Sequence, residues 1–176
     1  MTKNNVLIFD DFLDNVDLVR EDALLLSYTK STPNTMGWKG YRCLYTNEVG
    51  IEVSNLVMKK LISENSLFNE STLRCYFHYT LKDDGLSKEN IHKDFDVDYA
   101  GVIYLNPNPT PNSGTAFYDD LGNEKHYVEN IYNRFVLYPS NEWHSLKESF
   151  GDDILNSRLT FTIFCTLKKK QNESLI

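Results

Sequence analysis

The spacing of apolar residues in the first part of the chain predicts two helices. Residues 6–9 form a short apolar run, which predicts a strand that ends at two aspartates. A helix-like spacing of apolar residues follows, at positions 16, 19, 23, 24, 26 and 28. Asp14 or Asn15 would cap this helix. Residues 51–62 carry a second amphipathic stripe, and residues 29–45, with one proline and two glycines, predict a loop that passes into a strand.

From residue 72 onwards the pattern changes to short runs of strand-forming residues. The predicted strands cover residues 72–81, 99–105, 114–118, 125–129, 134–138 and 158–167. Two helices followed by about six strands predict an α+β chain whose core is an antiparallel sandwich or jelly roll. We expect a single domain over residues 1–176, with helical support in about 1–70, the strand core in about 71–168 and a solvated tail at 169–176.

The last predicted strand has one polar and one apolar face. Side chains alternate along a strand, so Arg158, Thr160 and Thr162 share one face and the apolar residues between them share the other. Both interpretations of this strand require the apolar face to be buried. In one, the polar face meets solvent and Arg158 is a surface residue. In the other, the polar face and Arg158 point into the interior of a barrel.

Composition and charge exclude several classes of protein. Hydrophobic residues make up 41% of the chain and aromatic residues 13%, which indicates a folded globular protein. The net charge of −7 does not favour binding to nucleic acid or to anionic membranes. No apolar stretch approaches membrane-spanning length. The three cysteines are odd in number and far apart, which favours free thiols and a cytoplasmic location.

Four side chains in a fixed order form the strongest chemical signal. His92 and Asp94 flank one lysine, His144 follows the run at 134–138, and Arg158 opens the last strand. Two imidazoles and one carboxylate are the ligands that hold a mononuclear Fe(II) ion on one face and leave the opposite face open. A downstream arginine can pair bidentately with the far carboxylate of a small diacid on that open face.

Nearby residues of the same types are alternative ligands. Asp96 and Asp98 follow Asp94 in one acidic stretch, and His126 precedes the run after which His144 stands. Residue type alone does not exclude any of these three.

With these residues the chain resembles the Fe(II)/2-oxoglutarate dioxygenases, and among them the prolyl 4-hydroxylase-like branch. The pattern of that family is His-x-Asp, a distal His and then Arg-x-Ser/Thr, which is met here by His92, Asp94, His144 and Arg158 with Thr160. The resemblance implies a double-stranded β-helix (a cupin-like jelly roll) with the N-terminal helices packed on the larger sheet. It also implies that Arg158 points inward.

The resemblance also implies the remaining parts of the site. Tyr104 matches the tyrosine that helps to hold the distal carboxylate of 2-oxoglutarate, and Tyr79, rather than Tyr76, is our expected second tyrosine near the co-substrate. The strand that begins at Gly114 resembles the family's glycine-containing strand, where a missing side chain lets backbones approach. The implied cofactors are Fe(II), 2-oxoglutarate and O2, with ascorbate as a supporting reductant.

The implied reaction is hydroxylation of a prolyl residue in a peptide or protein, or of a small amino-acid-like molecule, with release of succinate and CO2. The sequence leaves the prime substrate open. Two other classes also remain: a cupin-like metal enzyme that does not use 2-oxoglutarate, and a jelly-roll binding module without a metal. In the first, Arg158 has no co-substrate to bind. In the second, the two histidines and Asp94 need not converge.

Overall fold

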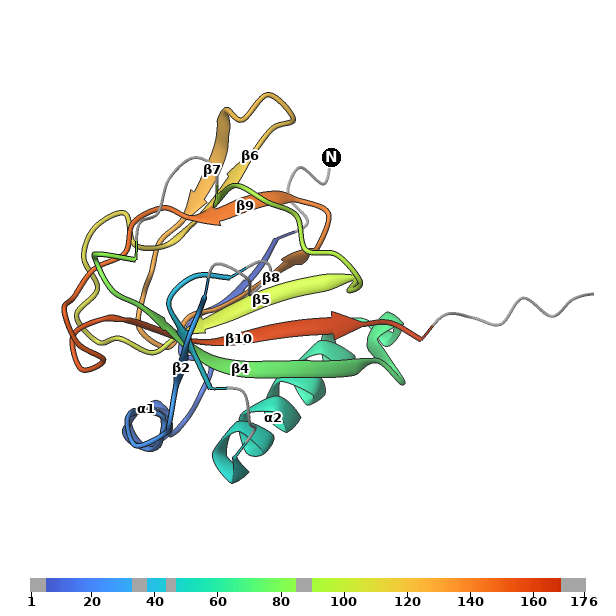
Figure 1. Ribbon diagram of the computed structural model, residues 1–176. Helices are drawn as coiled ribbons and strands as arrows, with labels where there is room; N and C mark the ends of the chain where they lie inside the picture. Colours follow the sequence, from blue (N-terminus) through green and yellow to red (C-terminus); the bar gives the residue numbers. More distant parts are fainter. Residues whose placement is uncertain (1–5, 33–37, 44–46, 85–89, 169–176) are drawn as a thin grey trace, which may run out of the picture.

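The computed structural model describes residues 6–32, 38–43, 47–84 and 90–168. Its elements, in chain order, are β1 (Leu7–Phe9), α1 (Val16–Leu24), β2 (Thr29–Lys30), β3 (Tyr41–Arg42), α2 (Glu48–Glu64), a 3-10 turn (Ser66–Phe68), β4 (Thr72–Thr80), β5 (Tyr99–Tyr104), β6 (Thr115–Tyr118), β7 (Glu124–Val128), β8 (Phe135–Pro139), β9 (Trp143–Leu146) and β10 (Arg158–Thr166). Figure 1 shows the strands in two layers, with both helices beneath the larger sheet.

The strands form two antiparallel sheets that together make the predicted jelly roll. The larger sheet has the order β1-β8-β5-β10-β4-β3-β2, and the smaller sheet has the order β7-β6-β9. Strand β10 lies at the centre of the larger sheet and pairs with β4 on one side and β5 on the other. The segment at His92 adds an isolated bridge to the outer edge of β9, so the smaller sheet is extended there by a single residue pair.

The outer face of the larger sheet is the main hydrophobic core. Leu159, Phe161 and Ile163 of β10 are at most 1% exposed and pack in one cluster with Val53 and Val57 of α2 and with residues of α1. The buried residues of α2 recur every three or four positions, which is why one stripe of this helix meets the sheet. The predicted packing of both helices against the apolar face of the last strand is confirmed.

The inner face of the larger sheet forms a second, smaller cluster between the two sheets. Val102, Tyr104 and Val136 from the larger sheet meet Phe117 and Val128 from the smaller one. Tyr104 and Phe117 are fully buried in it. Arg158, Thr160 and Thr162 lie on this same inner face and are at most 9% exposed, so the predicted inward orientation of the polar face is confirmed.

The sequence pattern located most elements to within a few residues and missed others. Strand β9 was not predicted: its four residues, 143–146, fall between the predicted strands at 134–138 and 158–167. Strands β2 and β3 have two residues each and fall in the segment that was interpreted mainly as a loop. Asn15 does occupy the cap position of α1, but its side chain makes no capping hydrogen bond. The predicted tail at 169–176 lies outside the described residues.

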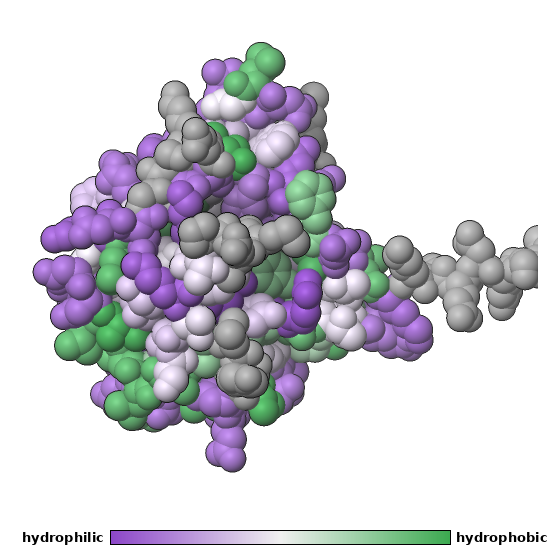
Figure 2. Space-filling view, viewed as in Figure 1, coloured by the Kyte–Doolittle hydropathy of each residue, from purple (hydrophilic) through white to green (hydrophobic). Residues whose placement is uncertain are grey.

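The surface and the cysteines agree with the composition. Figure 2 shows hydrophilic residues over most of the face drawn, with hydrophobic residues gathered near α1, where Leu18 and Leu25 are exposed. All three cysteines are buried and free. None of the helices in the described ranges is long and apolar enough to cross a membrane.

Candidate metal centre

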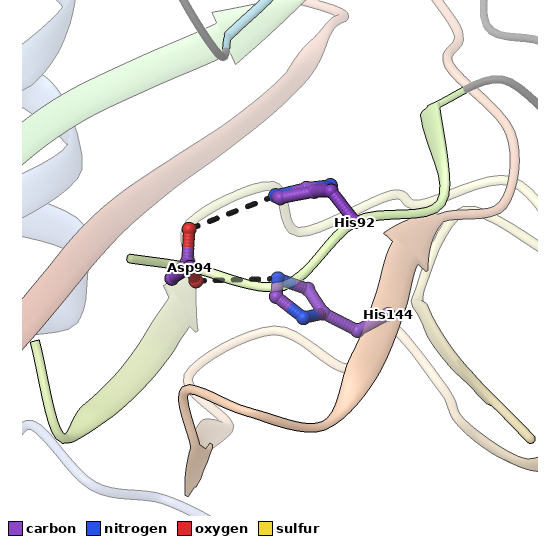
Figure 3. A group of neighbouring side chains, drawn as sticks. All are labelled: His92, Asp94 and His144. Atoms are coloured by element: carbon purple, nitrogen blue, oxygen red, sulfur yellow. Dashed lines mark ion pairs between the residues drawn. The ribbon is translucent and has the colours of Figure 1, made fainter. Parts of the chain in front are cut away.

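Two histidines from distant segments are brought face to face by a main-chain bridge. The amide N–H of His92 donates to the carbonyl of His144 at 3.0 Å, and the amide of His144 donates to the carbonyl of His92 at 2.9 Å. Asp94 follows on the same segment, where its own amide donates to the carbonyl of Ser140 at 2.9 Å. Figure 3 shows the result: both imidazole rings point at the carboxylate of Asp94.

The three side chains form one compact group. The Nε2 atoms of His92 and His144 lie 3.7 and 3.4 Å from the two carboxylate oxygens of Asp94. His144 and Asp94 have side chains that are 6% and 16% exposed, whereas the side chain of His92 is 44% exposed. His92 therefore lies on the solvent side of the group, and the other two lie on its inner side.

Each histidine is oriented by its second ring nitrogen. The Nδ1–H of His92 donates to the carbonyl of Asn90 at 2.8 Å, and the Nδ1–H of His144 donates to the carbonyl of Glu142 at 2.9 Å. A proton held on Nδ1 leaves the Nε2 lone pair free, which is the usual way in which proteins present an imidazole to a metal. Both free Nε2 atoms face Asp94.

The protonation states of the metal-free group follow from burial and mutual charge. Burial lowers the pKa of His92, but the hydrogen bonds to Asp94 and to the Asn90 carbonyl outweigh it and raise the pKa above its ordinary value. Burial and the nearby charge of His92 lower the pKa of His144 to about 4. Burial raises the pKa of Asp94, but the two histidines outweigh it and lower the pKa overall. At neutral pH Asp94 is ionised and His144 is neutral.

These residues fit a mononuclear divalent metal. His92, Asp94 and His144 can place one ligand atom each within 4.8 Å of one another, the only such group in the part of the chain that the structure describes. Metal bonds of about 2.0–2.2 Å to nitrogen and oxygen allow separations up to roughly 4.4 Å between two ligand atoms, which includes both separations from Asp94. Two imidazoles with one carboxylate suit Fe(II) on one face and leave other positions for small ligands.

A cavity of about 620 Å³ opens beside this group, between the two sheets. Its volume lies in the usual range for small-molecule sites. All three metal-group residues line it, and so does Arg158. The predicted arginine and the predicted metal ligands therefore share one cavity.

Arg158 is a buried residue of the cavity wall. It is 5% exposed, and its Nε–H donates to the carbonyl of Ser113 at 2.7 Å. That carbonyl is in reach because Gly114 follows it: a Cβ on Gly114 would lie 2.0 Å from the Val128 carbonyl oxygen, so only glycine lets the two strands approach here. The predicted role of this glycine in a close backbone approach is confirmed.

Tyr104 lies next to Arg158, as the sequence predicts. The guanidinium carbon is 5.3 Å from the centroid of the Tyr104 ring, and the phenol hydroxyl pairs with the hydroxyl of Thr115 at 2.8 Å. Thr115 lines the cavity. Thr160 lies on the same inner face and is fully buried, where its hydroxyl donates to the His78 carbonyl at 3.2 Å.

The prediction for Tyr79 is wrong, because this residue lies on the opposite face of the sheet. Tyr79 pairs with Leu159 of β10, whose side chain faces the helices. Its ring stacks on Tyr41 at a centroid distance of 4.5 Å and meets Tyr28 edge-on. Tyr76 has the opposite parity and lies on the inner face, where its ring meets that of Phe164.

The positions of Asp96, Asp98 and His126 exclude these alternative ligands from the metal group. The ring of His126 stacks on Phe117 at 4.4 Å and takes no part in the metal group. Asp98 accepts a hydrogen bond from the amide of Leu167. Asp96 lines the cavity but is not part of the group either.

Sequence reasoning did not find two further residues of the cavity wall, Arg42 and His78. Burial lowers the pKa of His78 to about 3, so this ring is neutral, and it contacts the Lys39 carbonyl at 2.6 Å. Arg42 stands between Tyr41, which stacks on Tyr79, and Cys43, which lies in the helix-facing core. The alternation of side chains over residues 41–43 is therefore the signal in the sequence that could have placed Arg42 on the inner face.

Comparison with known proteins supports the fold. No model of a known protein family matches the sequence, and no curated protein sequence matches it. A Trichoplax adhaerens prolyl hydroxylase, solved with a peptide of the hypoxia-inducible factor, aligns over 99% of this chain and 89% of its own, with a TM-score of 0.64 and 14% identity. A Burkholderia pseudomallei structure of the 2OG-Fe(II) oxygenase family aligns over 95% of this chain and 89% of its own, with a TM-score of 0.68 and 16% identity.

A prolyl-4-hydroxylase from Pseudomonas putida also aligns, over 95% of both chains, with a TM-score of 0.58 and 17% identity. At these identities the likeness concerns the fold. The chain therefore has the fold of the Fe(II)/2-oxoglutarate oxygenases, with the prolyl hydroxylases among its structural neighbours. This is the double-stranded β-helix that the sequence motif predicts.

Proposed function

We propose that the protein is a non-haem Fe(II)- and 2-oxoglutarate-dependent oxygenase that hydroxylates its prime substrate. The observation that carries this proposal is the presence of Arg158 in the same cavity as the His92, Asp94 and His144 group. Arg158 is 5% exposed, yet no described residue places a carboxylate within 4.0 Å of it. A buried guanidinium without an acidic partner supports a site for an anionic ligand.

The protein residues have distinct tasks in this proposal. The Nε2 atoms of both histidines and the carboxylate of Asp94 would hold Fe(II). Iron with 2-oxoglutarate and O2 supplies the oxidising chemistry, in which oxidative decarboxylation to succinate and CO2 accompanies hydroxylation of a C–H bond. Arg158 would orient the co-substrate by its distal carboxylate, with the Nε–Ser113 bond holding the guanidinium plane.

The surroundings of Arg158 would strengthen that pairing. The Tyr104 ring lies against the guanidinium, and Thr115, whose hydroxyl pairs with that of Tyr104, also lines the cavity. Burial on the inner face keeps water away from Arg158, so a carboxylate here would meet a fixed cation in a region of low dielectric. Thr160, buried beneath, supports the strand through its bond to the His78 carbonyl.

The prime substrate in this proposal is a prolyl residue of a peptide or a small amino-acid-like molecule. The structural neighbours include a prolyl hydroxylase solved with a peptide, which supports the first of these classes. The cupin-like alternative, a metal enzyme without 2-oxoglutarate, predicts no co-substrate binding at Arg158.

The test is uncoupled turnover, which does not require the prime substrate. Metal-free protein is incubated with Fe(II), ascorbate and 2-oxoglutarate in air, and succinate is measured. We expect succinate from the wild type and none above background from His92→Ala or Asp94→Ala. A 2-oxoglutarate titration with Mn(II) in place of iron provides a second readout. Absence of both succinate and 2-oxoglutarate binding would refute the proposal and favour the cupin-like class.

A further inference from the structure

Arg42 is a second arginine in the cavity that the proposed reaction leaves without a task. It lies on β3, opposite His78 of β4 in the antiparallel register, and lines the cavity. The turn before it depends on Gly40, which has a φ of +87° and where a Cβ would lie 2.4 Å from the Tyr79 carbonyl oxygen. This close approach to β4 fixes the start of β3 and thereby the position of Arg42.

The guanidinium of Arg42 is enclosed by aromatic rings. Its central carbon lies 4.7 Å from the centroid of Trp38, 4.8 Å from that of Tyr76 and 5.8 Å from that of Phe164. These rings hold a cation in place without neutralising it. The Nε atom is buried without a hydrogen-bond partner. Among the described residues, no carboxylate lies within 4.0 Å of this guanidinium.

Arg42 remains charged in spite of its burial. Burial lowers the pKa of Arg42 to about 10, against the raising effects of Tyr76 and Asp94. A guanidinium with this pKa is protonated at neutral pH. A buried donor without a partner costs stability, and a ligand that accepts a hydrogen bond from it would remove that cost.

The proposed reaction assigns the co-substrate to other groups. Its distal carboxylate would pair with Arg158 on β10, and its keto-acid end would lie at the metal group of His92, Asp94 and His144. Arg42 stands on β3, which β4 separates from β10 in the order of the larger sheet. Tyr104 flanks Arg158 from β5, and Tyr76 flanks Arg42 from β4. Arg42 is therefore left for a different anionic group.

The charge of the cavity wall agrees with a second anion. Four cationic side chains line the cavity, Lys39, Arg42, Lys93 and Arg158, against the carboxylates of Asp94 and Asp96. Lys93 has a carboxylate nearby, since its Nζ lies 3.9 Å from Asp120. A divalent metal at the metal group would add further positive charge.

We propose that Arg42 binds a free carboxylate of the prime substrate. The enzyme then acts on a small carboxylic acid, free amino acids included, and not on an internal residue of a polypeptide. This inference rests on the proposed function and narrows its substrate class. Trp38, Tyr76 and Phe164 act with Arg42 as positioning residues that keep the planar fork turned toward the cavity.

The experiment is a binding titration with Mn(II) and saturating 2-oxoglutarate, which prevents turnover. The probes are the standard L-α-amino acids and short linear monocarboxylic acids, each compared with its own primary amide. Thermal unfolding and calorimetry report binding for the wild type, Arg42→Gln, Arg42→Lys and the control Arg74→Gln. Arg74 is exposed on β4 and outside the cavity lining, so its variant removes one positive charge nearby without touching the site.

We expect at least one acid to bind the wild type and to be preferred over its amide. In Arg42→Gln that acid should bind about thirty-fold more weakly or worse, and the preference over the amide should disappear. Arg42→Lys should retain part of the preference, because it keeps the charge and loses the fork. Arg74→Gln should behave as the wild type. If Arg42→Gln does not fold, the Arg42→Lys result decides.

Three results would overturn the inference while leaving the proposed function intact. In the first, no acid binds the 2-oxoglutarate complex, and in the second, acids and their amides bind equally. In the third, Arg42→Gln and Arg42→Lys leave the preference for the acid unchanged. A loss of 2-oxoglutarate affinity in Arg42→Gln as large as in Arg158→Ala would instead assign Arg42 to the co-substrate, and would also overturn it. Failure of the wild type to bind 2-oxoglutarate at all would remove both proposals together.

Discussion

Replacing Arg158 tests the proposed co-substrate site directly. Its Nε–H is committed to the Ser113 carbonyl. Its two Nη atoms would supply a bidentate pair to the distal carboxylate of 2-oxoglutarate. Two hydrogen bonds to a charged group contribute about 1.5–3 kcal/mol each, and loss of a buried charged pair costs about 2–5 kcal/mol. Arg158→Ala should therefore weaken 2-oxoglutarate binding roughly thirty-fold or more.

The assay is a 2-oxoglutarate titration with Mn(II) in place of iron, after a separate titration of Mn(II) alone. Metal affinity should stay close to that of the wild type, because Arg158 is not in the metal group. Arg158→Lys should give an intermediate loss, since the charge remains and the planar fork does not. Arg74→Ala provides the matched control. If Arg158→Ala bound 2-oxoglutarate as tightly as the wild type, the reasoning would be wrong and the cupin-like alternative would be the better interpretation.

Three further predictions follow from contacts described above. The pKa of His92 is raised and that of His144 is lowered to about 4. Mn(II) affinity should therefore fall by about one decade per pH unit from above pH 6.5 down toward pH 4, because metal binding displaces one proton, from His92. A slope of two decades per pH unit in calorimetry would contradict this. Tyr104→Phe leaves the buried Thr115 hydroxyl without its partner and should lower the free energy of unfolding, measured in urea, by about 1–3 kcal/mol. It should weaken 2-oxoglutarate binding less than Arg158→Ala does. Unchanged stability would argue against that hydrogen bond. Phe161→Ala should lower the free energy of unfolding by about 3–5 kcal/mol. Leu18 is exposed on α1, so Leu18→Ala should lower it by less than about 0.5 kcal/mol. Equal losses of stability would contradict the assigned core.

The metal group was predictable because its signal is chemical and local. His92 and Asp94 are two apart, and His144 and Arg158 stand beside apolar runs that could be recognised as strands. The alternation of β10 also predicted which face would meet the helices, since a period of two is fixed by strand geometry. Convergence of the three ligands could only be expected from the resemblance, because it depends on pairing between distant segments.

The errors arose where local pattern does not determine parity or pairing. Tyr76 and Tyr79 lie on one strand with aromatic residues on both faces, so hydrophobicity did not separate the inner face from the outer. Strand β9 has four residues and lacks β-branched side chains, so only its pairing with β6 makes it a strand. Arg42 belongs to a two-residue strand whose place is set by contacts with β4.

The bridge between His92 and His144 has a consequence for how the protein would gain and lose a bound metal. Each residue donates its amide to the other's carbonyl, so main-chain pairing by itself fixes how far apart the two histidines stand. In the proposed enzyme, folding and metal uptake would then be separate events. A chelator should empty the site without unfolding the chain, and added metal should restore activity.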